Sequence, residues 1–221
     1  NNFGESFKTL IGTRAYLFEH QIDTIIKGLS KENCRLMLAD EVGLGKTIEA
    51  LVMLKGLKKD NEKILLIIPE ALVNQWQHEL DSKLWMESVI YNGSNLNSSD
   101  IVIVPVEMVA VVSAEKLINI FDYCVIDEVH RIIGENQLYD KMLYICKNIK
   151  NVLLLSATPI QNRKEEYLQL LKLLNPEKYE YMTEREFTEL FDKNSNIRRL
   201  VYRVYRDLPS AYGEDIDMDE V

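Results

Sequence analysis

The feature that most constrains this chain is an alternation of short apolar runs with longer segments of helical period. Short, continuous apolar runs are typical of parallel strands that are buried on both faces of a sheet. The intervening segments are typical of crossover helices, so the pattern predicts an α/β fold with a doubly wound, mostly parallel sheet and helices on both faces. We expect strands at residues 36–39, 64–68, 101–104, 123–126 and 152–155, and helices at 47–57, 72–83, 107–119 and 137–147.

The edge at which these strands end is the expected ligand-binding edge, because open α/β sheets bind ligands outside the carboxyl ends of their strands. Pro69, Pro105 and Pro159 each follow an expected strand closely and predict ordered turns at that edge. The pattern changes after residue 174, where an Asn-Pro pair stops a helix. A polar helical region is expected from there to about residue 192.

The composition excludes several classes of chain. With 47% apolar and 28% charged residues, and 9 Gly and 5 Pro in 221 residues, the chain is neither disordered nor collagen-like. No apolar run approaches the roughly 18 residues of a membrane span, and no leader opens the chain. Three cysteines without a CxxC pair and three scattered histidines indicate a reducing compartment without a metal cluster. We therefore expect a cytoplasmic protein with no membrane partner and, since it begins with Asn1, a piece of a longer chain.

The charge is uneven along the sequence. Overall there are 26 basic and 35 acidic residues, a net charge of −9. Residues 207–221 carry six of the acids and no Lys or Arg, which leaves 26 basic against 29 acidic residues, or −3, for the remainder. This balance argues against a protein that coats nucleic acid, although Arg-rich residues 198–206 offer one basic strip. We expect one domain at residues 1–206 and a flexible acidic end at 207–221.

Residues 39–47 read ADEVGLGKT and lie between an expected strand and an expected helix. The glycines allow backbone N–H groups to point at phosphate oxygens, Lys46 can neutralise phosphate charge, and the Thr47 hydroxyl can bind Mg²⁺. The strict phosphate-loop pattern has Gly where this chain has Asp40. A glycine turn that caps a helix is the alternative, and the strand–loop–helix context favours phosphate binding.

Residues 122–130 read DYCVIDEVH, an apolar run that ends in two carboxylates. Asp127 is placed at the strand tip to hold Mg²⁺, and Glu128 can orient the attacking water. Adjacent acids alone are usually solvated loop residues, but a phosphate loop earlier in the chain favours the catalytic interpretation.

Residues 152–162 read VLLLSATPIQN, in which Ser156 and Thr158 on their own only cap a turn.

The order DEVGLGKT, DEVH and SATP resembles the first lobe of superfamily 2 helicase-like ATPases. DEVGLGKTIEA and LLLSATPIQN are similar to the Swi/Snf-type DNA translocases, especially their bacterial, RapA-like branch, and the resemblance covers roughly residues 10–206. It implies a RecA-like, P-loop lobe that binds ATP and Mg²⁺. It also implies ATP hydrolysis that drives translocation on duplex DNA or remodelling of protein–DNA complexes.

The resemblance further implies roles for single residues. Lys46 and Thr47 would hold phosphates and Mg²⁺, Asp127 would hold Mg²⁺, and Glu128 would act on the water. Gln21, at the end of RAYLFEHQ, resembles the adenine-reading amide of the family. The other nucleotide-binding positions implied are Arg14, Asp40, Glu41, Gly43, Leu44 and Gly45.

Two further elements resemble those that link nucleotide state to DNA. The segment IIPEALVNQW resembles an element that touches the nucleic-acid backbone through Pro69, Gln75 and Trp76, although packing explains Gln75 and Trp76 equally well. The coupling elements implied by the resemblance are His130, Ser156 and Thr158. The acidic box is DEVH where the family commonly has DEAH, and its reactive groups are intact.

Motors of this family hydrolyse ATP between two RecA-like lobes, and the second lobe supplies arginine fingers. We expect that lobe to lie outside this sequence, so the chain alone should be nearly inactive. The partners implied are duplex DNA, a second lobe, and RNA polymerase or another protein target. Two alternatives stay open: a lobe of an RNA helicase or restriction-type translocase, and a non-hydrolysing, nucleotide-gated interaction module.

Overall fold

The computed structural model describes residues 33–38, 46–134, 136–156 and 164–193. Within these ranges six strands form one sheet in the order β1-β6-β5-β2-β4-β3, and every neighbouring pair is parallel. The strands are β1 (Arg35–Leu38), β2 (Ile64–Ile68), β3 (Val89–Ile90), β4 (Ile101–Pro105), β5 (Tyr123–Ile126) and β6 (Asn151–Leu155).

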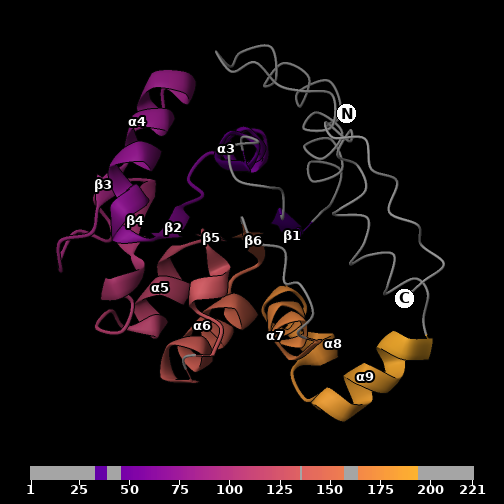
Figure 1. The fold of residues 1–221 in the computed structure, drawn as a ribbon. Helices are drawn as coiled ribbons and strands as arrows, with labels where there is room; N and C mark the ends of the chain where they lie inside the picture. The colour runs from indigo at the N-terminus through magenta and orange to yellow at the C-terminus, as the bar shows by residue number, and fades with distance from the viewer. Residues whose placement is uncertain (1–32, 39–45, 135, 157–163, 194–221) are drawn as a thin grey trace, which may run out of the picture.

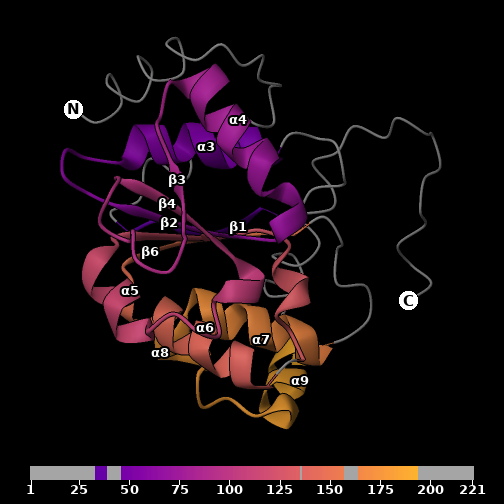
Figure 2. The ribbon, with the colours of Figure 1, turned by 90° about the vertical axis from the view of Figure 1, so that its left-hand side faces the viewer.

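Helices cover both faces of the sheet, as Figures 1 and 2 show. One face carries α3 (Lys46–Leu57) and α4 (Val73–Leu84). The other carries α5 (Ala114–Ile120), α6 (Asn136–Asn148) and α7 (Lys164–Leu174), with α8 (Pro176–Tyr179) and α9 (Glu184–Lys193) outside α7. Short 3₁₀ turns follow β2, β4 and β5: η1 (Glu70–Leu72), η2 (Val106–Met108) and η3 (Val129–Arg131). The predicted doubly wound α/β class is confirmed.

The strand β2 shows why the apolar runs are continuous. Leu65 and Ile67 join the core beneath α5, α6 and α7, whereas Ile64, Leu66 and Ile68 join the core beneath α3 and α4. All five side chains are fully buried. Because successive side chains of a strand point to opposite faces, a strand covered on both sides needs an apolar residue at every position.

The five expected strands are present, with ends that differ by at most one residue from the prediction. The sixth strand, β3, was missed because two residues are too short to show a period. The helix expected at 107–119 is wrong in its first half, which forms η2 and a turn before α5 begins. The reason is Ser113, whose hydroxyl accepts the Lys116 N–H at 3.3 Å and starts a new helix.

The region after residue 174 also follows its sequence signals. Asn175 accepts the Lys178 N–H and begins α8, and Pro176 occupies its first turn. A small cluster of buried side chains then holds α8 and α9 against α7; its members are Leu168, Tyr179 and Phe187. The expected helical region therefore consists of two helices. Residues 194–221, with the Arg-rich strip and the acidic end, lie outside the described residues.

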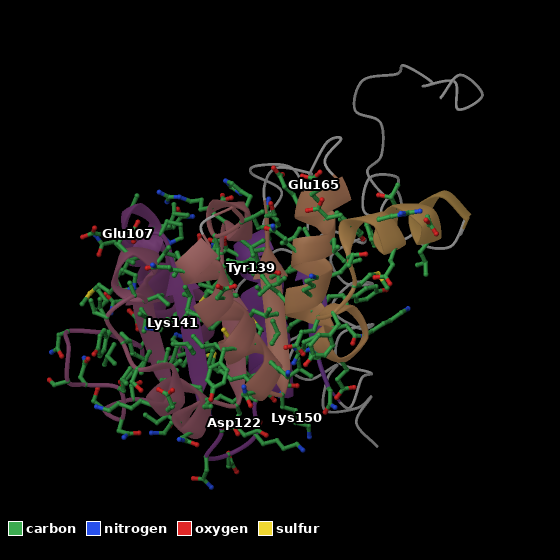
Figure 3. The ribbon with its side chains drawn as sticks, turned by 90° about the horizontal axis from the view of Figure 1, so that it is seen from below. Glu107, Asp122, Tyr139, Lys141, Lys150 and Glu165 are labelled. Carbon is green, nitrogen blue, oxygen red and sulfur yellow. The ribbon has the colours of Figure 1, made fainter. Side chains whose placement is uncertain are left out.

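The two ends of the sheet can be told apart in Figure 3, which views the layer of α5, α6 and α7. Asp122 and Lys150 precede β5 and β6 and lie toward one end of this layer. Glu107 and Glu165 follow β4 and β6 and lie toward the other end of the layer, which is the carboxyl end of the strands.

In the part of the chain described here, no helix has the length and apolar character needed to cross a membrane.

Candidate functional site at the carboxyl edge of the sheet

The strand order brings three separate sequence motifs to one place. β6 lies between β1 and β5, so the carboxyl ends of these three strands are neighbours. Asp127 directly follows β5, Ser156 directly follows β6, and Lys46 opens α3 after the segment that follows β1. The site therefore lies where parallel strands end, which is where α/β sheets bind ligands.

Lys46 is the first residue of α3, and its side chain is largely buried. Burial raises the pKa of the Asp127 carboxyl, and the nearby positive charge of Lys46 opposes part of that rise. Thr47 is half-buried in the same turn. The first N–H groups of a helix lack partners within the helix and favour anions, so this turn is suited to a phosphate group.

Asp127 is held by two hydrogen bonds although it is only 6% exposed. Its Oδ2 accepts the indole N–H of Trp76 at 2.8 Å, and its Oδ1 accepts the backbone N–H of Glu128 at 2.8 Å. Burial raises the pKa of Asp127, while these two hydrogen bonds and the charge of Lys46 act in the opposite direction. A cation at the carboxylate would favour its ionised form further.

Glu128 has a left-handed backbone, with φ 49° and ψ 47°. This conformation costs an L-residue about 1–2 kcal/mol and often marks functional positions. It turns the chain from β5 directly into η3, where the Nδ1 of His130 lies 3.2 Å from the Oε2 of Glu128. The backbone strain therefore places a carboxylate and an imidazole side by side beyond the tip of β5.

Ser156 is fully buried at the tip of β6. Its backbone N–H donates to the carbonyl of Leu38 at 3.0 Å. This bond joins the ends of β6 and β1, so the third motif lies between the other two.

The segment expected to touch nucleic acid divides into buried and exposed residues. Pro69 is buried where β2 ends, and Gln75 is exposed, with its Nε2 donating to Glu79 Oε1 at 3.1 Å. Trp76 is 1% exposed. Burial of Trp76 favours the packing alternative for this residue over contact with nucleic acid.

The hydrogen bond between Trp76 and Asp127 was missed by the sequence analysis. Part of its signal was present, because Val73, Trp76, Leu80 and Leu84 recur at helical spacing and predict a buried face of α4. A buried indole N–H usually finds an acceptor. The identity of that acceptor depends on β2 and β5 being neighbours, which no local pattern reveals.

Several predicted site residues lie outside the described residues. They are Arg14, Gln21, Asp40, Glu41, Gly43, Leu44, Gly45 and Thr158.

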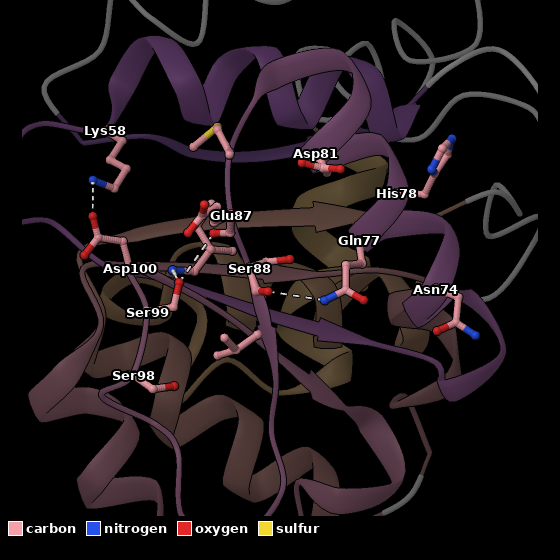
Figure 4. A pocket seen from close by; sticks show the side chains of 13 residues that line it. Lys58, Asn74, Gln77, His78, Asp81, Glu87, Ser88, Ser98, Ser99 and Asp100 are labelled. Carbon is pink, nitrogen blue, oxygen red and sulfur yellow. Dashed lines mark hydrogen bonds and ion pairs between the residues drawn. The ribbon is translucent and has the colours of Figure 1, made fainter.

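A separate open groove of about 960 Å³ lies between α4 and the β3–β4 edge (Figure 4). Its wall includes the Gln77 Nε2, which donates to the Ser88 carbonyl at 3.2 Å, and the ion pair of Lys58 with Asp100 at 3.1 Å. The groove lies at the strand farthest from β1 in the sheet order.

Among the described residues, no group of three or more His, Cys, Asp or Glu side chains is arranged to hold a metal ion.

Comparison with known proteins identifies relatives over most of this chain. The uncharacterized ATP-dependent helicase YqhH of Bacillus subtilis (strain 168) is 39% identical over 166 residues, which are 71% of this chain and 29% of that protein. The RNA polymerase-associated protein RapA of Haemophilus influenzae is 31% identical over 202 residues, which are 82% of this chain and 22% of that protein. The chain thus spans less than a third of the length of these two curated relatives.

Solved structures show the same fold. The SWI2/SNF2 ATPase core of Sulfolobus solfataricus in complex with dsDNA aligns with a TM-score of 0.67 at 19% identity, over 87% of this chain and 43% of that one. The UvsW helicase from bacteriophage T4 aligns with a TM-score of 0.59 at 15% identity, over 71% of this chain and 58% of that one. A family model of the SNF2-related domain matches residues 20–210. The chain therefore belongs to the SNF2-related domain family, and its parallel sheet has the RecA-like fold of the SWI2/SNF2 ATPase core.

Proposed function

We propose that this chain is the ATP-binding lobe of a DNA-dependent ATPase that translocates on duplex DNA or remodels protein–DNA complexes. The observation that carries the proposal is the meeting of Lys46, Asp127 and Glu128 at one edge of the sheet in a chain of the SNF2-related family. Phosphate, metal ion and water are the three things that ATP hydrolysis must hold. One cation and two carboxylates at the ends of neighbouring elements match that need.

The nucleotide would bind across the start of α3. Lys46, the first residue of α3, would face the phosphates as a cation, and the N–H groups of the first helical turn would donate to phosphate oxygens. Gly43 and Gly45 belong to the phosphate-binding loop in this proposal. Gln21 would contact the adenine, and Arg14 would be a further nucleotide-binding residue. We propose that Asp40, Glu41 and Leu44 are also part of the nucleotide-binding loop before α3.

The residues of the site suit Mg²⁺. This ion prefers oxygen ligands and is usually bound by one or two protein groups together with phosphates and water. Asp127 provides a carboxylate with a fixed orientation, and Thr47 provides a hydroxyl. When bound, Mg²⁺ would neutralise phosphate charge. Asp127 would hold the ion in place, and the site needs no third carboxylate.

Glu128 is the residue that would act on water. It lies one residue beyond Asp127, with a side chain about a quarter exposed, so it is able to meet both solvent and substrate. It would orient the attacking water and accept its proton. His130 beside it, and Ser156 between the neighbouring strand tips, are the residues through which we propose that the nucleotide site is coupled to bound DNA.

The proposed partners follow from the relatives. Duplex DNA is present in the structure of the Sulfolobus solfataricus core, and RapA is by name associated with RNA polymerase. We propose duplex DNA and a second RecA-like lobe as partners of this chain, with RNA polymerase as a candidate protein target. Pro69 and Gln75 are the described residues that we propose nearest the DNA backbone.

ATP turnover by the full-length protein tests this proposal. We expect duplex DNA to stimulate turnover more than single-stranded DNA or RNA, and we expect Lys46→Ala to abolish both nucleotide binding and turnover. Lys59→Ala is the matched control, because Lys59 is an exposed lysine just after α3. Full turnover by Lys46→Ala would contradict the phosphate-loop assignment. Stimulation by RNA alone would support an RNA helicase, and binding without turnover would support an interaction module.

A further inference from the structure

Trp76 connects the helix α4 to the acidic box. It lies in the first turns of α4, and its indole Nε1 is 2.8 Å from Asp127 Oδ2, although the two residues are 51 positions apart in sequence. Both side chains are buried. The contact exists because β2, which leads into α4, is paired with β5, which leads into Asp127.

The two hydrogen bonds to Asp127 fix the plane of its carboxylate. Trp76 donates to one oxygen and the Glu128 backbone donates to the other. A carboxylate with a donor on each oxygen cannot rotate about its last bond without breaking one of them. The indole donor is itself fixed, because the ring is fully packed in the core beneath α3 and α4.

Each oxygen keeps capacity for a second partner, since a carboxylate offers about four acceptor directions and these two bonds use one on each oxygen. The carboxylate is thus oriented by the protein and still able to bind a cation. Partners that orient metal ligands in this way typically change metal affinity by about 10–100-fold when they are removed.

We propose that Trp76 is a positioning residue for Mg²⁺·nucleotide binding: its indole N–H holds the Asp127 carboxylate in the orientation that receives the ion. This inference rests on the proposed role of Asp127. It assigns Trp76 a task beyond packing, since packing needs only the ring, whereas orientation of the carboxylate needs the N–H.

Trp76→Phe separates the two tasks, because it keeps an aromatic ring and removes the donor. In the full-length protein at saturating ATP, we expect this variant to need roughly tenfold more free Mg²⁺ for half-maximal turnover, with recovery of turnover at high Mg²⁺. Trp85→Phe is the matched control, since Trp85 is 61% exposed at the far end of α4. The control should leave the Mg²⁺ dependence unchanged.

A spectroscopic measurement on protein that retains Trp76 does not depend on turnover or on how Trp76→Phe folds. The 221 residues contain two tryptophans, so their indole N–H signals can be assigned with Trp85→Phe. Paramagnetic Mn²⁺ added with ADP should broaden the Trp76 indole signal strongly and the Trp85 signal little. Asp127→Asn should abolish that broadening.

The outcomes distinguish this inference from the proposal on which it rests. If Asp127→Asn leaves the Mg²⁺ dependence and the broadening unchanged, the assignment of Asp127 is wrong. A second outcome is that Asp127→Asn changes the Mg²⁺ dependence and the broadening while Trp76→Phe has the same Mg²⁺ dependence as Trp85→Phe. In that case Asp127 keeps its role, and the inference about Trp76 is overturned. Should Trp76→Phe fail to fold, equal broadening of both indole signals in the unmodified protein would overturn the inference.

Discussion

The amino ends of β1, β5 and β6 and their carboxyl ends both bury polar side chains, and they differ in what those side chains bind. At the amino end, Arg35 donates five hydrogen bonds to carbonyls at or just beyond the ends of α6 and α7; the acceptors are Cys146, Ile149, Lys150, Leu173 and Leu174. A cation at helix carboxyl ends satisfies carbonyls that have no partner within the helix.

The other polar groups of the amino end are likewise matched. The Oδ1 of Asn151 accepts the Cys34 N–H at 2.9 Å, and its Nδ2 donates to the Asp122 carbonyl at 3.2 Å. The Tyr123 hydroxyl lies 2.9 Å from Glu62 Oε2. These bonds join strands to their connections and stabilise the fold.

The carboxyl end holds its polar groups at a cost. Burial raises the pKa of Asp127, and Glu128 is held in a left-handed backbone conformation. Both features destabilise an unliganded fold, and both suit residues that bind an ion or a water. The comparison teaches that burial of a polar group does not by itself indicate function. The bonds of Arg35 and Asn151 join strands and helices, whereas the Asp127 carboxylate keeps acceptor capacity to spare and is followed by a strained backbone at Glu128.

The largest expected effect is at the carboxyl end. Glu128→Gln should slow ATP turnover by roughly a hundredfold or more, because the amide cannot accept the proton of the attacking water. Its unfolding free energy should change by less than about 0.5 kcal/mol. Turnover assays and urea titrations of the full-length protein measure the two quantities, with the exposed Glu70→Gln as control. Turnover equal to that of the control would remove Glu128 from the chemistry.

Arg35→Met should lower the unfolding free energy and leave ATP turnover unchanged, which is the reverse of the result for Glu128→Gln. It retains an unbranched apolar chain but leaves helix-end carbonyls without their donor, so we expect a loss of about 2–4 kcal/mol in unfolding free energy. Turnover per folded molecule should be unchanged. Arg185→Met, at an arginine whose side chain is 88% exposed, should cost less than about 0.5 kcal/mol. An equal cost for both variants would show that the five hydrogen bonds add no net stability.

Tyr123→Phe tests how a buried polar group at the amino end makes stability depend on pH. Burial, followed by the hydrogen bond to Glu62, raises the pKa of the Tyr123 hydroxyl. Above about pH 10 the unfolded chain loses this proton while the folded chain keeps it, so stability falls as pH rises by at most about 1.4 kcal/mol per pH unit. The Phe variant should lose about 1 kcal/mol at pH 7 and show a shallower alkaline decline. The exposed Tyr144→Phe should keep the steep decline.

The smallest expected effect concerns the backbone of Glu128. Glu128→Gly and Glu128→Ala both remove the carboxylate and should both lose turnover. Only Gly adopts the left-handed conformation without strain, so we expect it to be more stable than Ala by about 1 kcal/mol in urea titrations. Greater stability of the Ala variant would mean that no strain is held at this end of the sheet.

Most of the fold follows from local patterns. The apolar runs define five of the six strands, because strands buried on both faces must be apolar throughout. The α4 face and the end of α7 follow from helical spacing and from the Asn-Pro pair. The missed β3 is too short to show a period, and the false extension of the helix before Ser113 arose because the Ser113 cap starts a new helix there.

The sequence by itself determined five of the six described strands, the motifs and the chemistry that each motif can perform, since these depend on residues close together along the chain. Only the tertiary structure decided that β6 separates β1 from β5, that Trp76 donates to Asp127, and that Arg35 joins the ends of α6 and α7. The physical reason is that strand order and buried hydrogen bonds are contacts between distant residues. Their partners are selected by packing of the whole sheet, and no local period encodes that selection.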